Sequence, residues 1–281
     1  MFYAPRLSPD GKQLVITRID EPGSANGEIW IYDLIANTER QLTFDPALDG
    51  YPIWTRDGQK IVFTSSRAGG RNLFWRPADG SGRDERLTTG ANVQSPWGWS
   101  RDETTLVLAE RSANTDWDIA VLSMSGNSST SPLIQTRYLE TFPAVSPDGR
   151  WIAYHSTEAG RQEVYVRPFP NINDGKWRVS REGGGEAVWS RDGRELFYIG
   201  GMGLMAVPVT TEPTFSSGAP EVLFPWRYVD VPGTPSYDVA RDGRRFLMVK
   251  ELTPADQTSA RPELIVVLNW LDELKRLVPS Q

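Results

Sequence analysis

The chain has 281 residues, 39% of them apolar and 11% aromatic, and this composition excludes a disordered chain because it supplies enough apolar surface for a core. Its net charge of −6 comes from residues scattered along the chain, which favours neither nucleic acid nor an anionic membrane as a partner. Cysteine is absent, so disulfides and thiolate metal sites are excluded.

Near its start the chain carries the turn-forming string SPDG, and related strings recur five more times. The six copies, which we call the turn motifs, occupy residues 8–11, 55–58, 100–103, 146–149, 190–193 and 240–243. Their aspartates are 44 to 50 residues apart, a period typical of propeller blades. Ser or Thr opens a type I turn, Asp bonds back to the backbone, and Gly takes the left-handed conformation that follows. We therefore predict that each motif joins the two inner strands of a blade and that all six lie on one face.

Segments rich in β-branched and aromatic residues flank each turn motif and are predicted to be strands. In the second unit they are residues 52–54, 60–64, 72–76 and 85–88, and in the fourth unit residues 144–145, 151–154, 163–167 and 176–179. Four strands per unit predict an all-β, six-bladed propeller of four-stranded antiparallel blades, forming one domain over residues 1–270. The predicted blades span about residues 4–49, 50–94, 95–141, 142–184, 185–233 and 234–270.

The last part of the chain departs from this pattern. Apolar residues at helical spacing, from Trp270 to Val278, predict a short C-terminal amphipathic helix over residues 270–279. The sixth unit has only three candidate strands before this helix, and no candidate strand precedes Ala4 to complete it. We therefore expect a three-stranded last blade in a chain that belongs to a longer protein.

The units resemble the TolB-type, WD40-like repeats called PD40, after the Pro-Asp pair seen at residues 9–10 and 147–148. More narrowly, the chain is similar to the C-terminal propeller of bacterial eukaryotic-like serine/threonine kinases in segments such as PRLSPDGKQLVITR, GRQEVYVRPFP and YDVARDGRRFLMVK. The resemblance implies a binding scaffold or sensor within a larger kinase-linked or TolB-like protein, and it favours a periplasmic or extracytoplasmic location. The chain shows neither kinase motifs nor a signal peptide, so kinase activity is not implied for it.

His155 is the one histidine, and we expect a structural role because a single histidine without cysteine does not make a transition-metal site. A serine hydrolase would need this histidine, yet no Gly-x-Ser-x-Gly motif accompanies it. We therefore predict no catalytic residue, no metal and no cofactor. The alternative is a hydrolase or a hydrolase-gating propeller, of glycosidase or prolyl-oligopeptidase type, with its site in the central funnel. The loop carboxylates that would suit such chemistry are Asp45, Asp49, Glu140, Glu182 and Glu186.

Two recurring residue types are assigned structural roles. The turn-motif aspartates come one per unit, too far apart to share a calcium ion, so we expect them to form turns. Trp54, Trp99 and Trp189 directly precede their motifs, where aliphatic residues stand in the other units. This interchange with aliphatic residues favours packing between blades over ligand stacking.

The connections on the face opposite the turn motifs vary widely in length, and variable loops are typical of the binding surface of repeat proteins. We therefore predict that this face binds a protein or peptide partner, or a small ligand, at the funnel mouth. The candidate contacts are Phe44, Asp49, Tyr51, Arg137, Tyr138, Glu140, Glu186, Arg227 and Tyr228. Binding that depended instead on Arg56, Arg101 and Arg191, within the turn motifs, would place the ligand on the other face.

Overall fold

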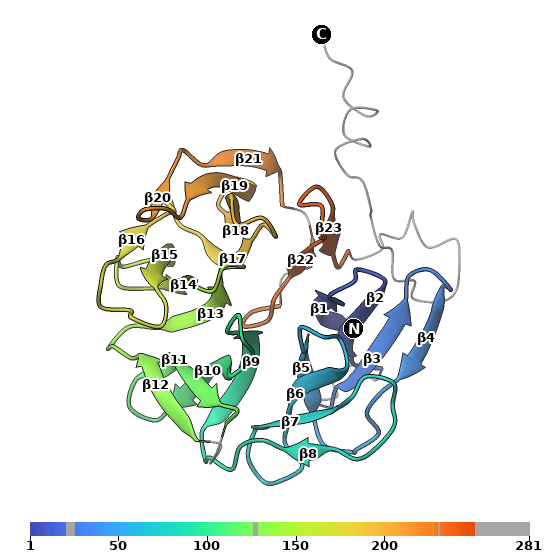
Figure 1. Ribbon diagram of the computed structural model, residues 1–281. Helices are drawn as coiled ribbons and strands as arrows, with labels where there is room; N and C mark the ends of the chain where they lie inside the picture. The colour runs from blue at the N-terminus through green and yellow to red at the C-terminus, as the bar shows by residue number, and fades with distance from the viewer. Residues whose placement is uncertain (21–25, 126–128, 227, 230, 251–281) are drawn as a thin grey trace.

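The chain forms a ring of antiparallel sheets around a central axis, as Figure 1 shows. This computed structural model describes residues 1–20, 26–125, 129–226, 228–229 and 231–250. These residues form 23 strands, and among them no helix is long and apolar enough to cross a membrane. The predicted all-β propeller of four-stranded antiparallel blades is confirmed.

The first three blades each contain four strands in consecutive order. Blade 1 comprises β1 (Phe2–Leu7), β2 (Gln13–Arg18), β3 (Glu28–Asp33) and β4 (Thr38–Gln41). Blade 2 comprises β5 (Asp49–Trp54), β6 (Lys60–Ser65), β7 (Asn72–Pro77) and β8 (Glu85–Arg86). Blade 3 comprises β9 (Val93–Trp99), β10 (Thr105–Ser112), β11 (Asp116–Ser123) and β12 (Thr130–Ile134).

The remaining sheets follow the same order around the ring. Blade 4 comprises β13 (Glu140–Val145), β14 (Trp151–Ser156), β15 (Glu163–Pro168) and β16 (Trp177–Arg178). Blade 5 comprises β17 (Gly185–Trp189), β18 (Glu195–Gly200), β19 (Gly203–Thr210), β20 (Ser216–Ser217) and β21 (Glu221–Phe224), the last two both pairing with β19. The sixth unit comprises β22 (Tyr237–Val239) and β23 (Phe246–Met248).

The prediction of six four-stranded blades is wrong in number, because the described residues form five complete blades and a two-stranded sixth unit. The third strand predicted for that unit and the helix predicted over residues 270–279 lie outside the described residues. The two strands nevertheless take a place in the ring. Phe246 meets Phe197 of blade 5 with ring centroids 5.1 Å apart, and Leu247 packs with Leu14 of blade 1. The sixth unit therefore bridges blades 5 and 1.

Each turn motif joins the two innermost strands of its sheet, as predicted, and its own side chains hold it. In the first motif the hydroxyl of Ser8 donates to Asp10 Oδ1 at 2.6 Å and accepts the backbone N–H of Gln13 at 2.9 Å. The same pair of bonds recurs in the next four motifs. The sixth motif has Ala240 in place of the hydroxyl and keeps the bonds of Asp242 to the backbone. The aspartates form turns, as expected.

Indole N–H groups join neighbouring blades at their innermost strands. Trp99 Nε1 donates to the carbonyl of Trp54 in blade 2 at 3.0 Å, and Trp54 Nε1 donates to the carbonyl of Arg6 in blade 1 at 3.1 Å. Trp189 Nε1 donates to the carbonyl of Ala144 in blade 4 at 2.9 Å. All three tryptophans are buried. The prediction that they pack between blades is confirmed.

The innermost strands of four blades bulge at equivalent positions. Ala4, Tyr51, Phe142 and Glu186 each lie four residues before a turn motif, at a shift in strand register, and have φ between 54° and 56°. A left-handed φ costs a residue other than glycine roughly 1–2 kcal/mol, so the surrounding packing must hold these positions. Bulges re-aim side chains, and two members of this set line the central cavity described below.

Replacing Ser146 with alanine removes both side-chain hydrogen bonds of the fourth motif, leaving Asp148 and the N–H of Trp151 without this partner. Because Ser146 is buried, we expect the free energy of unfolding to fall by about 1–3 kcal/mol. Urea denaturation followed by tryptophan fluorescence measures the change. The control Ser131→Ala alters an exposed serine and should change that free energy by less than about 0.5 kcal/mol. Equal effects of the two substitutions would contradict the role of the motif.

Candidate functional site

A cavity of about 550 Å³ lies at the centre of the ring. Residues of the innermost strand of every unit line it. These strands are β1, β5, β9, β13, β17 and β22, which surround the axis in Figure 1. Residues of the turn motifs line it as well, so it reaches the face on which the turns lie. The cavity is therefore shared by all six units and belongs to no single blade.

Aromatic side chains form part of the cavity wall. Trp97 and Phe142 contact each other with ring centroids 4.5 Å apart, and His155 lies against Phe142 at 4.8 Å. His155 is buried, and its ring nitrogens have no hydrogen-bond partner among the described residues. Burial lowers the pKa of His155 to about 4, so the ring is neutral at pH 7. This geometry gives His155 a packing role, in keeping with the structural role expected of it.

Two carboxylates line the cavity, and both are bonded to neighbouring groups. Glu186 accepts hydrogen bonds from the backbone N–H and the hydroxyl of Ser236, at 2.7 and 3.1 Å. Asp238 accepts the backbone N–H of Leu7 at 2.7 Å and that of Val239 at 2.8 Å. Burial raises the pKa of Asp238, against the opposing effect of a nearby arginine charge. These bonds tie the sixth unit to blade 5 and to blade 1.

Four arginines line the same cavity. Arg6 comes from β1, with its guanidinium carbon 5.8 Å from the centre of the Trp97 ring. Arg56, Arg191 and Arg241 come from the second position of three different turn motifs. From the sequence, Arg56 and Arg191 were considered only as contacts on the other face, and Arg6 and Arg241 were not predicted. The available signal was arginine at the second motif position in four of six copies, where proline stands in the other two.

Of the nine residues predicted to contact ligand, Glu186 lines the central cavity and the other described ones do not. Glu140 is buried and accepts hydrogen bonds from the hydroxyls of Thr136 and Ser156. Tyr51 lies edge-on to Tyr3, with ring centroids 5.8 Å apart. Glu140 and Tyr51 therefore interact with other residues of the chain itself.

The next predicted contacts come from separate segments of the chain. Phe44 is 72% exposed, and Arg137 donates to the hydroxyl of Tyr138 at 2.8 Å on the surface. Tyr228 packs against Trp226, with ring centroids 5.3 Å apart. Arg227 lies outside the described residues. The predicted set therefore does not converge on one point.

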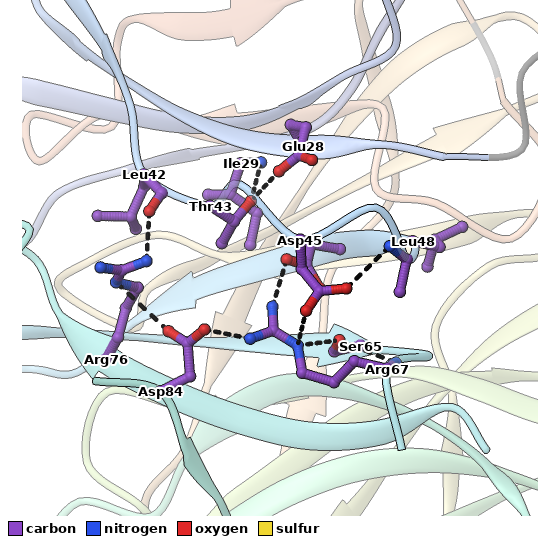
Figure 2. A network of polar contacts seen from close by, with 12 residues as sticks. Glu28, Ile29, Leu42, Thr43, Asp45, Leu48, Ser65, Arg67, Arg76 and Asp84 are labelled. Atoms are coloured by element: carbon purple, nitrogen blue, oxygen red, sulfur yellow. Dashed lines mark hydrogen bonds and ion pairs between the residues drawn. The ribbon is translucent and has the colours of Figure 1, made fainter. Parts of the chain in front are cut away.

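Asp49, also predicted as a contact, is the buried member of a partly exposed charge network on blade 2. Figure 2 shows Arg67 at its centre, facing acidic side chains from two loops. The Arg67 guanidinium lies 2.5 Å from Asp49 Oδ2 and 3.8 Å from Asp45 Oδ2, and it also contacts Asp84. Although the cluster is acidic, no group of three or more metal-binding side chains in the described part of the chain is arranged to hold a metal ion. The network ties the β6–β7 connection of blade 2 to β5 and to Asp84, and through Asp45 it reaches the connection that leads in from blade 1.

Glu28 lies at the edge of this network. Its Oε2 accepts the hydroxyl of Thr43 at 2.6 Å, while that hydroxyl accepts the N–H of Ile29 at 2.9 Å (Figure 2). Burial raises the pKa of Glu28 to about 7, and the charge of Asp49 adds to the effect. Burial likewise raises the pKa of Asp49 to about 6, against the lowering effects of Ser65 and Arg67. Ionisation of Glu28 therefore disfavours the folded state.

A raised folded-state pKa means that the stability contributed by protonated Glu28 is present below pH 4.5 and lost as the pH rises through about 7. Glu28→Gln keeps the acceptor and stays neutral. We therefore expect this variant to match the wild type in urea midpoint at pH 4 and to exceed it at pH 8. The control Glu221→Gln changes an exposed glutamate on β21 and should show no such pH dependence. A constant difference between Glu28→Gln and wild type across this range would contradict the prediction.

The curated relatives of this chain are longer proteins. "Tol-Pal system protein TolB" of Wolinella succinogenes is 27% identical over 160 residues, which are 55% of this chain and 36% of that protein. "Tricorn protease homolog 1" of Streptomyces coelicolor is 24% identical over 174 residues, which are 60% of this chain and 16% of that protein. The chain thus spans well under half the length of either relative.

Solved structures share the fold. A putative TolB from Agrobacterium tumefaciens has a TM-score of 0.62 at 16% identity, covering 79% of this chain and 82% of its own. A prolyl endopeptidase has a TM-score of 0.56 at 12% identity, covering 88% of this chain and 38% of its own. The PD40 family, described as the TolB beta propeller domain, matches residues 1–167, which is more than half of the sequence. The chain therefore belongs to the TolB β-propeller domain family.

Proposed function

We propose that this chain is a non-catalytic scaffold or sensor module that holds a segment of a protein or peptide partner in its central cavity. The observation that carries the proposal is the cavity itself, which residues from all six units line and which sets Trp97 and Phe142 beside charged groups. Concave sites with aromatic walls and a few placed polar groups are the usual form of a binding pocket. A small molecule of matching size is the second ligand class that the cavity would admit.

A place within a larger assembly is part of this proposal. One relative is named as a protein of the Tol-Pal system, and by analogy this chain would also act together with other proteins. We also propose linkage to a kinase and a periplasmic or extracytoplasmic location, both of which the sequence resemblance implies. We further propose that residues 1–270 form a single domain.

Hydrolase chemistry is the competing function, because prolyl endopeptidases and a puromycin-hydrolysing peptidase share the fold. At 12% and 16% identity this likeness concerns the fold alone. His155 is neutral, buried against Phe142 and without a hydrogen bond to any described residue, so it lacks the partners of a general base. This arrangement supports the non-catalytic proposal. Turnover of ester, peptide or glycoside substrates that His155→Ala abolished would overturn it.

Gly98 offers a direct test of binding in the cavity. It lines the cavity, and a Cβ built on it meets no atom within 4 Å, so Gly98→Phe should place a ring in the cavity without distorting the backbone. Peptides selected from a random displayed library on the wild-type chain should bind this variant at least tenfold more weakly, as measured by fluorescence anisotropy. The reason is steric, because the added ring occupies the space of the ligand.

Gly201 supplies the matched control, because it also has open space around its Cβ and does not line the cavity. Gly201→Phe should bind the selected peptides like the wild type, and both variants should keep its melting temperature. Equal binding by Gly98→Phe and Gly201→Phe would place the ligand elsewhere. In that case loss of binding in Tyr138→Ala would point to the loop face, where the sequence analysis put it.

A further inference from the structure

The second residue of the turn motif lies at the rim of the central cavity in five of the six motifs. The five residues are Pro9, Arg56, Pro147, Arg191 and Arg241. Arg101, at the same motif position, does not line the cavity. Hydroxyl and aspartate bonds hold the backbone of the first five motifs, and aspartate bonds hold that of the sixth, so the turns form a rigid rim. Proline already suits this turn position, so the turn itself does not require arginine there.

The three rim arginines are close enough for their charges to act on one another. Burial, and then the charges of Arg241 and Arg56, lower the pKa of Arg191. Arg56 donates to the carbonyl of Arg101 at 3.0 Å, whereas Arg191 and Arg241 make no hydrogen bond to any residue that the structure describes. The charge of Asp238 opposes this lowering at Arg191. Three guanidinium groups nevertheless share the rim, and gathering like charges costs free energy that a bound anion would offset.

The cavity lining carries four arginines against two carboxylates, although the whole chain has a net charge of −6. The carboxylates, Glu186 and Asp238, already accept hydrogen bonds from Ser236 and Leu7, and these bonds close the ring. Trp97 lines the same cavity, and its buried indole N–H has no partner among the described residues. The lining therefore offers several unused donors and an excess of positive charge.

We propose that the rim formed by Arg56, Arg191 and Arg241 is a carboxylate-binding site, which anchors an acidic peptide that enters the cavity from the turn-motif face. The proposal rests on the proposed function and specifies its ligand. Guanidinium groups bind carboxylates through paired N–H donors, and peptides supply carboxylates as Asp or Glu side chains or as a C-terminus. Binding would therefore use the face opposite to the one predicted from loop variability.

Arginine side-chain NMR of the full chain tests the site with defined probes. The probes are amidated acetyl-triglutamate, acetyl-triglutamine with a free C-terminus, amidated acetyl-triglutamine and inorganic phosphate. We expect saturable shifts of the Arg191 and Arg241 Nε–Hε signals with the first probe, the second or both, which distinguishes side-chain from terminal carboxylates. The amidated triglutamine should cause none. Absence of saturable shifts with both carboxylate probes, equal shifts with the neutral peptide, or shifts with phosphate alone would overturn the proposal.

The double variant Arg191→Gln/Arg241→Gln should weaken binding of the responding probe at least tenfold. Arg101→Gln is the matched control, because Arg101 has the same motif position outside the cavity, and it should bind like the wild type. Melting temperatures of both variants show whether they fold. A double variant that folds and binds normally would contradict the proposal.

The displayed-library selection separates this proposal from the proposed function. Selected peptides that lose binding to Gly98→Phe, but carry no acidic enrichment and bind the double arginine variant normally, would uphold the cavity as the binding site and refute the carboxylate rim. Carboxylate probes that shift the Arg191 and Arg241 signals, in a chain that selects no cavity-dependent peptide, would uphold the rim and refute the peptide-binding function.

Discussion

The contact between the innermost strands of neighbouring blades is the interaction on which the rest of this structure depends. A blade cannot bury both faces of its sheet alone, so each gains its stability by stacking on the next. Trp54 and Trp99 make this stacking directional, because each indole N–H meets one particular carbonyl of the preceding blade. These bonds set the spacing of the innermost strands. Such bonds occur between blades 1 and 2, blades 2 and 3, and blades 4 and 5, where they help to hold the innermost strands around the cavity.

Polar groups hold the seam where the ring closes, and they shape the chemistry of the cavity. Glu186 bonds to Ser236 across the junction of blade 5 with the sixth unit, and Asp238 bonds to Leu7 across the junction with blade 1. Both carboxylates line the cavity. The hydrogen bonds that close the ring therefore occupy carboxylate oxygens that would otherwise be acceptors in the cavity lining. Of the rim arginines, Arg191 and Arg241 make no hydrogen bond to any described residue. The positive character of the cavity thus follows from how the ring is closed.

Residues whose role depends on distant partners were the ones that sequence reasoning could not place. Asp49 has the composition and loop position of a ligand contact, yet it is buried against Arg67, 18 residues away. Glu140 is similarly engaged by Thr136 and Ser156. The sequence does not distinguish a charged loop residue that is exposed to solvent from one that is paired inside the protein. The difference depends on which segments pack over the residue.

By itself the sequence determined the repeat, the four-strand order of blades 1 to 4, the turns and the tryptophans between blades. Those features rest on hydrogen bonds and strand patterns within a few residues, as in the bonds of Ser8 to Asp10 and Gln13. Only the tertiary structure decided which side chains face the axis. Arg56 and Arg191 are 135 residues apart and share one rim because the ring carries the chain around its axis. Whether two distant residues meet at the axis depends on the number and tilt of the packed sheets. No local sequence pattern specifies that number or tilt.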